Sequence, residues 1–84
     1  MGTHHSDERF YSVRLTTEGV EYTAEIWRDA PDRWLLLAVL PDIGVAIADL
    51  DRPFPSLELA LLEAEVLAGE AVRRSRQIAP TIRV

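Results

Sequence analysis

The sequence contains no cysteine, no lysine and no asparagine, and it has only 4 glycines and 5 prolines among 84 residues. Without cysteine, disulfide frameworks, thiolate zinc sites and thiol chemistry are all excluded. Glycine and proline are too scarce for a collagen-like or low-complexity chain, and the hydrophobic share of 48% is too high for a disordered one. The sequence therefore predicts a globular protein with a small core that has no covalent support.

The charge balance is acidic. Asp and Glu number 14 against 9 arginines, and the net charge of −5 argues against general nucleic-acid binding. The exclusive use of arginine as the basic residue indicates the coding bias of a GC-rich bacterial genome. The longest apolar run, Trp34 to Pro41, is far shorter than the roughly 18 residues of a membrane span. We therefore expect a soluble, cytoplasmic protein with no membrane partner, and no signal peptide at its N-terminus.

Residues 1–9 are polar and aperiodic, so we expect a mobile tail ahead of a single domain over residues 10–84. The tail holds the only two histidines, His4 and His5. Adjacent histidines in such a tail are more often incidental, or part of a cloning-derived leader, than metal ligands. We therefore predict no metal site and no cofactor.

Alternation of apolar and polar residues predicts a β-hairpin. Apolar residues alternate with polar ones from Phe10 to Thr17 and again from Val20 to Arg28, with Glu18-Gly19 between them as a two-residue turn. Trp34–Leu40 is apolar at every position, which is typical of a central strand covered on both faces. After a Pro-Asp-Ile-Gly turn, Val45–Ala48 predicts a short fourth strand.

A long helix is expected to close the chain. Ser56 is a good N-cap, and the helix should run from Leu57 to Ile78, because Pro80 prevents its continuation. Residues 81–84 could add a terminal strand. Strands followed by one helix predict an α+β fold: a three- to four-stranded antiparallel sheet with the helix packed on one face.

The helix has apolar residues on two sides. On a helical wheel, one broad, alanine-rich stripe is suited to packing on the sheet. Three further residues, Leu59, Leu62 and Val66, fall together on the opposite side at i, i+3 and i+7. A lone helix on a small sheet should be polar there, so the chain has more apolar surface than it can bury alone.

This surplus predicts an interface, most economically in a homodimer. The expected interface residues are Trp27, which stands among polar residues on the outer face of its strand, Leu59, Leu62, Val66 and Arg73. The alternative is that loops or the N-terminal arm fold over the second face of the sheet.

No catalytic constellation is predicted. Asp42, Asp49 and Asp51 could bind Mg²⁺ or act as acid and base, but aspartate is also the ordinary residue of turns. The sequence lacks both a Ser-His-Asp set within its predicted elements and a glycine-rich phosphate loop. The cluster Arg73-Arg74-x-Arg76 fits the C-terminal end of a helix dipole. We therefore expect a protein without enzymatic activity.

From Trp34 to Val72 the chain resembles the HicB-type antitoxin domain. The resemblance lies in an apolar strand that ends in Pro41-Asp42-Ile43-Gly44 and in the helix start Ser56-Leu57-Glu58-Leu59-Ala60, followed by Ala64 and Ala68. The family commonly has Thr at the cap, a second acid at the position of Leu59 and a Gly before the cap, none of which is present here. The resemblance implies binding of a basic, toxin-like ribonuclease, which the net charge suits.

Two interpretations of function follow. In the first, the protein is a small, non-catalytic interaction domain, homodimeric and able to bind a basic partner. In the second, it is a ligand-binding protein or enzyme with a pocket between helix and sheet near Trp34 and Asp42. An alanine-rich seam between helix and sheet leaves little room for a pocket, which disfavours the second interpretation.

Overall fold

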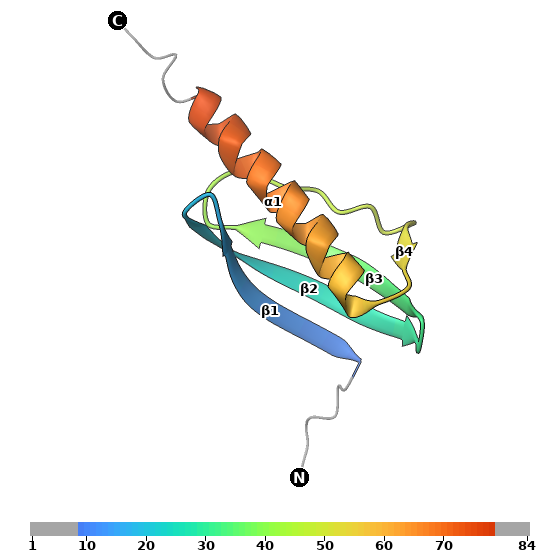
Figure 1. Cartoon of the computed structure of the whole chain (residues 1–84). Helices are drawn as coiled ribbons and strands as arrows, with labels where there is room; N and C mark the ends of the chain where they lie inside the picture. Colours follow the sequence, from blue (N-terminus) through green and yellow to red (C-terminus); the bar gives the residue numbers. More distant parts are fainter. Residues whose placement is uncertain (1–8, 79–84) are drawn as a thin grey trace, which may run out of the picture.

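The computed structural model describes residues 9–78, which form one sheet and one helix (Figure 1). The fold is α+β, as the sequence predicts. The expected tail over residues 1–8 and the expected strand over 81–84 lie outside the described residues. In chain order the elements are β1 (Phe10–Thr17), β2 (Val20–Ala30), β3 (Arg33–Pro41), β4 (Pro53–Phe54) and α1 (Leu57–Ile78).

The sheet is a meander with the spatial order β1-β2-β3-β4, and every neighbouring pair is antiparallel. The β1–β2 hairpin turns through Glu18 and Gly19, both with positive φ (53° and 76°). This is the conformation in which a two-residue turn follows the twist of its strands. The predicted hairpin is therefore confirmed, with Thr17 paired to Val20 at its closed end.

The predicted fourth strand at Val45–Ala48 is wrong. The strand that pairs with β3 is the two-residue β4, with Trp34 opposite Phe54. The chain departs from β3 at Gly44, whose φ is 88° and where a Cβ would lie only 2.6 Å from the carbonyl oxygen of Ala71. This close approach directs the following residues along α1, so that Ala46 and Ala48 pack on the core without joining the sheet.

The helix begins where the sequence predicts, because the Ser56 hydroxyl accepts a hydrogen bond from the Leu59 amide at 3.2 Å. Its alanine-rich stripe, here called the inner stripe, faces the sheet and is buried. The stripe consists of Ala60, Ala64, Ala68, Ala71 and Val72.

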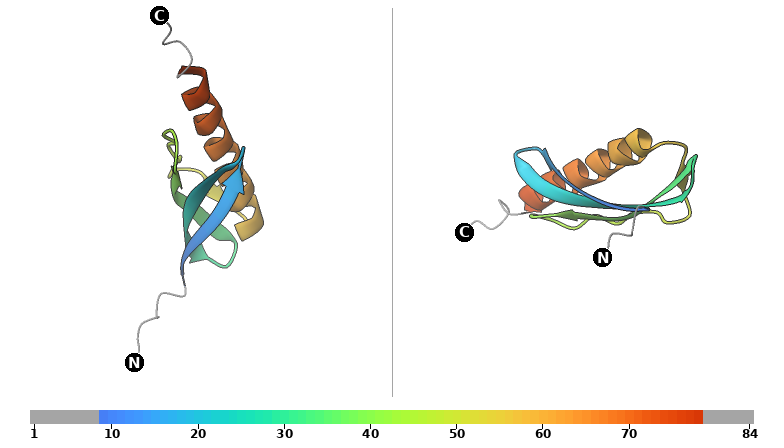
Figure 2. Two further views of the ribbon diagram at one scale, coloured as in Figure 1. Left: turned by 90° about the vertical axis from the view of Figure 1, so that its left-hand side faces the viewer. Right: turned by 90° about the horizontal axis from the view of Figure 1, so that it is seen from below.

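The inner face of the sheet supplies the large side chains of the core. Ile26, Leu36 and Val39 are no more than 2% exposed and lie in one cluster with the alanines of the helix. Figure 2 shows α1 on one side of the sheet only. The expectation that Trp34–Leu40 is covered on both faces is wrong for the described residues, since Leu37 and Leu40 are exposed.

Candidate interaction surfaces

The outer face of the sheet carries a line of apolar residues that crosses all four strands. Phe10 lies opposite Trp27, Trp27 opposite Leu35, and Leu35 opposite Pro53. We call these four residues the apolar row. Phe10 is 38% exposed and Pro53 is exposed, while Trp27 and Leu35 are half-buried. The row exists because the strand registers bring single apolar residues of four separate segments side by side.

The other end of the same face is polar. Arg14 donates hydrogen bonds to Glu21 Oε1 at 3.1 Å, to Thr23 Oγ1 at 2.8 Å and to Asp42 Oδ2 at 2.9 Å. The hydrogen bond to Asp42 is the largest of the contacts that raise the pKa of Arg14. Because all these charges are exposed, the pairs contribute little to stability. They give that end of the outer face a polar cluster, beside which Leu40, the strand partner of Thr23, is 50% exposed.

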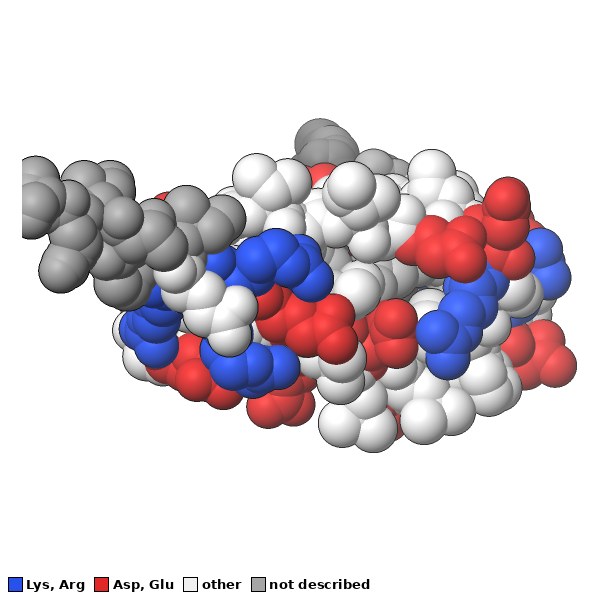
Figure 3. Space-filling view, turned by 90° about the horizontal axis from the view of Figure 1, so that it is seen from above, with Lys and Arg blue, Asp and Glu red and all other residues white. Residues whose placement is uncertain are grey.

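The second apolar surface lies on α1, facing away from the sheet. Leu59, Leu62 and Val66 are 43%, 56% and 52% exposed, and we call them the outer ridge. The sequence predicted this exposure from helix phase alone, and the structure confirms it. In the space-filling view from above, positive and negative side chains lie beside one another in groups, and uncharged surface lies between the groups (Figure 3).

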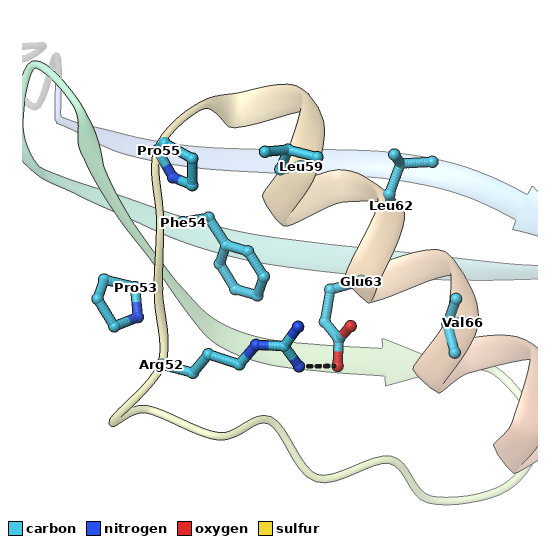
Figure 4. Close-up of a pocket in the computed structure, with 8 residues that line it drawn as sticks. All are labelled: Arg52, Pro53, Phe54, Pro55, Leu59, Leu62, Glu63 and Val66. Atoms are coloured by element: carbon cyan, nitrogen blue, oxygen red, sulfur yellow. Dashed lines mark ion pairs between the residues drawn. The ribbon is translucent and has the colours of Figure 1, made fainter.

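A groove of about 380 Å³ lies on one side of the outer ridge (Figure 4). Its walls come from the ridge and from the segment at β4, where the ring of Phe54 lies under the helix. Arg52 stacks over that ring, 5.2 Å from its centroid, and also pairs with Glu63 at 3.4 Å. This groove is therefore apolar, with one neutralised acid at its edge.

A second groove, of about 500 Å³, lies between α1 and β1 on the other side of Leu62. Leu15, Tyr22 and Leu61 form its apolar part, and Glu58 and Glu65 stand at its rim. Burial, with a smaller contribution from the charge of Glu65, raises the pKa of Tyr22. Both rim carboxylates belong to exposed residues, so the groove combines apolar walls with an uncompensated negative edge.

The five residues predicted for one interface lie on two separate surfaces. Trp27 belongs to the apolar row on the outer face of the sheet, whereas the outer ridge lies on the helix that covers the opposite face. Arg73 lies in line with the ridge, but its guanidinium pairs with Glu18 of the β1–β2 turn at 2.7 Å. No single partner surface can therefore contact all five residues.

Trp34 and Asp42, the two residues expected to border a ligand pocket, lie at opposite ends of β3. Trp34 is the second residue of β3, and Asp42 follows the last one, so they stand about 25 Å apart at the usual rise of a strand. Trp34 is 8% exposed and packs on Tyr11, with 5.3 Å between ring centroids. Neither residue lines either of the two grooves, so the described residues do not support the expected location of a ligand pocket.

The three aspartates considered as a cation site do not converge. Asp42 binds Arg14, while Asp49 accepts a hydrogen bond from the Asp51 amide at 3.0 Å at the far end of the loop. Among residues 9–78, no group of three or more His, Asp or Glu side chains could hold a metal ion. Within the same range, α1 is not apolar enough to cross a membrane.

Sequence reasoning missed most of the apolar row. It identified Trp27 as an apolar residue among polar ones, but Phe10, Leu35 and Pro53 gave no such signal. The alternation of β1 does place Phe10 on the polar face, away from Tyr11, and that mismatch was the available clue. The groove at Phe54 depends on β4 and had no sequence signal.

The segments that carry the HicB-type resemblance form a bend after β3 and a capped helix start. Such features are required wherever a strand is followed by a turn and a helix, so membership of that family stays a prediction. Comparison of the chain with protein-family models, with curated proteins and with solved structures gave no match.

Proposed function

We propose that this protein is a non-catalytic interaction module that forms a homodimer through the outer face of its sheet. The observation that carries the proposal is the apolar row, which lies on a face that no described element covers. Apolar side chains in a contiguous exposed group are typical of protein interfaces. Two copies related by a twofold axis would bury the row of one against the row of the other.

A second copy of the chain is the favoured partner for the apolar row, because an uncharged patch can pack against an identical patch without repulsion. A twofold contact joins identical patches, so a patch with a strong charge of one sign opposes self-association, and an apolar one does not. The polar end of the face carries Arg14 together with Glu21 and Asp42, and it would lie at the rim of such an interface.

Sedimentation equilibrium tests the proposal. The wild-type chain should sediment at twice its mass of 9.5 kDa. Trp27→Gln, at the middle of the row, should weaken the dimer by about 30-fold, as expected for an aromatic anchor. Thr16→Gln, at the polar end of the same face, is the matched control and should leave the dimer intact.

Leu62→Gln on the outer ridge serves as a second control and should also leave the dimer intact. A wild-type chain that stays monomeric at millimolar concentration would refute the homodimer. If Leu62→Gln dissociates the dimer and Trp27→Gln does not, the helix and not the sheet forms the contact.

We also propose a basic protein as a further partner, as the HicB-type resemblance implies. The net charge of −5 supports such a partner, because opposite charges accelerate association and help to select the correct protein. If the protein blocks a ribonuclease, it should inhibit RNA cleavage by a basic protein that is encoded beside it. Measuring RNA cleavage by that partner, with and without this protein, tests the role.

A further inference from the structure

The outer ridge continues along α1 as a heptad pattern. Leu59, Leu62, Val66, Gly69 and Arg73 follow one another at intervals of three, four, three and four residues. This is the spacing with which one helix packs along another. Gly69 is covered by Thr17 at the end of β1, and Arg73 forms an ion pair with Glu18. The open part of the seam is therefore the N-terminal half of α1, from Leu59 to Val66.

Acidic residues border this seam on both sides. In the same heptad, Glu58 and Glu65 occupy the positions on one side, and Glu63 and Glu70 those on the other. Glu63 is paired with Arg52. Glu58, Glu65 and Glu70 are exposed, and none of their carboxylates takes part in an ion pair between described residues.

A second copy of this helix would fit the seam poorly. In a parallel pair, Glu58 and Glu65 of one copy would face Glu63 and Glu70 of the other. In an antiparallel pair, Glu58 and Glu65 of one copy would face Glu58 and Glu65 of the other. Glu63 and Glu70 would face their own counterparts in the same way. Both orientations bring glutamates together, and such like-charge contacts oppose association. These glutamates therefore favour an occupant that carries positive charge over a second copy of the helix.

We propose that the outer ridge binds an amphipathic helix of another protein, one that carries Lys or Arg on both sides of an apolar seam. The two grooves beside Leu62, of about 380 and 500 Å³, would receive its large apolar residues. An apolar cavity of about 150 Å³ already accommodates benzene, so each groove has room for an aromatic or branched side chain. The basic residues of the partner would lie beside Glu58, Glu65 and Glu70.

This inference rests on the proposed interaction function, but it uses the side of the molecule opposite the apolar row, apart from Pro53, which belongs to the row and also lines the smaller groove. The two contacts can therefore form at the same time, and each can fail without the other. A dimer that joins through the sheet would present two outer ridges, one on each outer side. The protein should accordingly remain a dimer when the basic helix binds.

Two synthetic helical peptides test the proposal by isothermal titration calorimetry with the full chain. They share one leucine seam, and the residues beside the seam are Lys and Arg in the first peptide and Glu in the second. The first should bind, more weakly as ionic strength rises, and the second should not. Binding of neither peptide, or equal binding of both, would overturn the proposal.

Two protein variants of equal net charge locate the site. Glu58→Gln with Glu65→Gln should weaken binding of the basic peptide about fivefold, as expected for two exposed charge pairs. Glu25→Gln with Asp32→Asn, on the sheet and the β2–β3 turn, should leave it unchanged. Equal loss in both variants would show attraction to the net charge alone and would overturn the proposal.

Leu62→Ala removes the side chain between the two grooves. Because Leu62 is 56% exposed, the fold should persist, as circular dichroism would verify, and affinity for the basic peptide should fall about tenfold. Unchanged affinity would overturn the proposal. Sedimentation equilibrium of the same samples measures the homodimer separately. If the chain is monomeric but still binds the basic peptide, only the proposed homodimer is refuted.

Discussion

The two faces of α1 reverse the usual relation between side-chain size and burial. Three alanines of its inner stripe are completely buried, whereas the larger residues of its outer ridge are 43–56% exposed. Full burial of one such leucine or valine would stabilise the fold by about 1.5–3 kcal/mol, yet the fold leaves all three outside. The small residues let the helix backbone lie close to the sheet, and the large ones remain available for contact with another molecule.

The large side chains of this core come from the sheet and not from the helix. Ile26, Leu36 and Val39 fill the space under the helix, and the alanines of α1 provide the surface on which they pack. Side chains between helix and sheet can therefore be neither much smaller nor much larger. Removing volume from the sheet side opens a cavity, and adding volume on the helix side pushes the helix away from the sheet. The outer ridge has neither constraint within the monomer.

The largest effect is expected from removing a sheet residue beneath the inner stripe. Leu36 is 1% exposed, so Leu36→Ala should lower the free energy of unfolding by about 2–5 kcal/mol through lost burial and a cavity. Leu62→Ala deletes the same atoms from the outer ridge and should cost no more than about 0.5 kcal/mol. Urea denaturation measures both, and similar losses would show that the ridge belongs to the core.

Overfilling the inner stripe should have the next largest effect. Ala64 is completely buried against the sheet, so Ala64→Leu should cost about 1–3 kcal/mol, because the added atoms force the helix away from its contacts. Val66→Leu adds volume to the outer ridge and should change the stability by less than about 0.5 kcal/mol. A tolerated Ala64→Leu would indicate unfilled space under the helix.

Gly69 lies at the border between the two faces and should tolerate a side chain. A Cβ there would lie 3.3 Å from Arg73 Nη1, the far end of a flexible side chain. Gly69→Ala should therefore stabilise the fold by up to about 1 kcal/mol through helix propensity. Gly44→Ala should instead destabilise the fold, because the new Cβ would meet the backbone of Ala71. Thermal unfolding compares them, and a destabilised Gly69→Ala would mean that Arg73 cannot move.

The smallest effect is confined to alkaline solution. Burial, and to a lesser extent Glu65, raises the pKa of Tyr22 above its usual value near 10. The unfolded chain then loses the phenolic proton first, so the free energy of unfolding is unaffected below about pH 10 and falls as the pH rises through the folded-state pKa. Tyr22→Phe should remove this part of the alkaline decline in urea titrations. An identical decline in both chains would contradict the assignment.

Local patterns in the sequence predict the β1–β2 hairpin, the strand β3, the helix and the two faces of the helix. Alternation over Phe10–Thr17 and Val20–Arg28, the Glu18-Gly19 turn and the Ser56 cap are local signals, because each depends on residues a few positions apart. The same holds for the two sides of α1, since helical periodicity alone separates the inner stripe from the outer ridge.

The pairing of the fourth strand and the grouping of apolar residues on the outer face of the sheet depend on the tertiary structure. The Val45–Ala48 pattern predicts a strand, but the contact of Gly44 with Ala71 carries this segment along the helix and leaves the pairing with β3 to Pro53–Phe54. The apolar row likewise arises from strand register between distant residues, which brings Phe10, Trp27 and Leu35 together. Register and close backbone contacts are set by the whole packed chain, so no local pattern of residues specifies them.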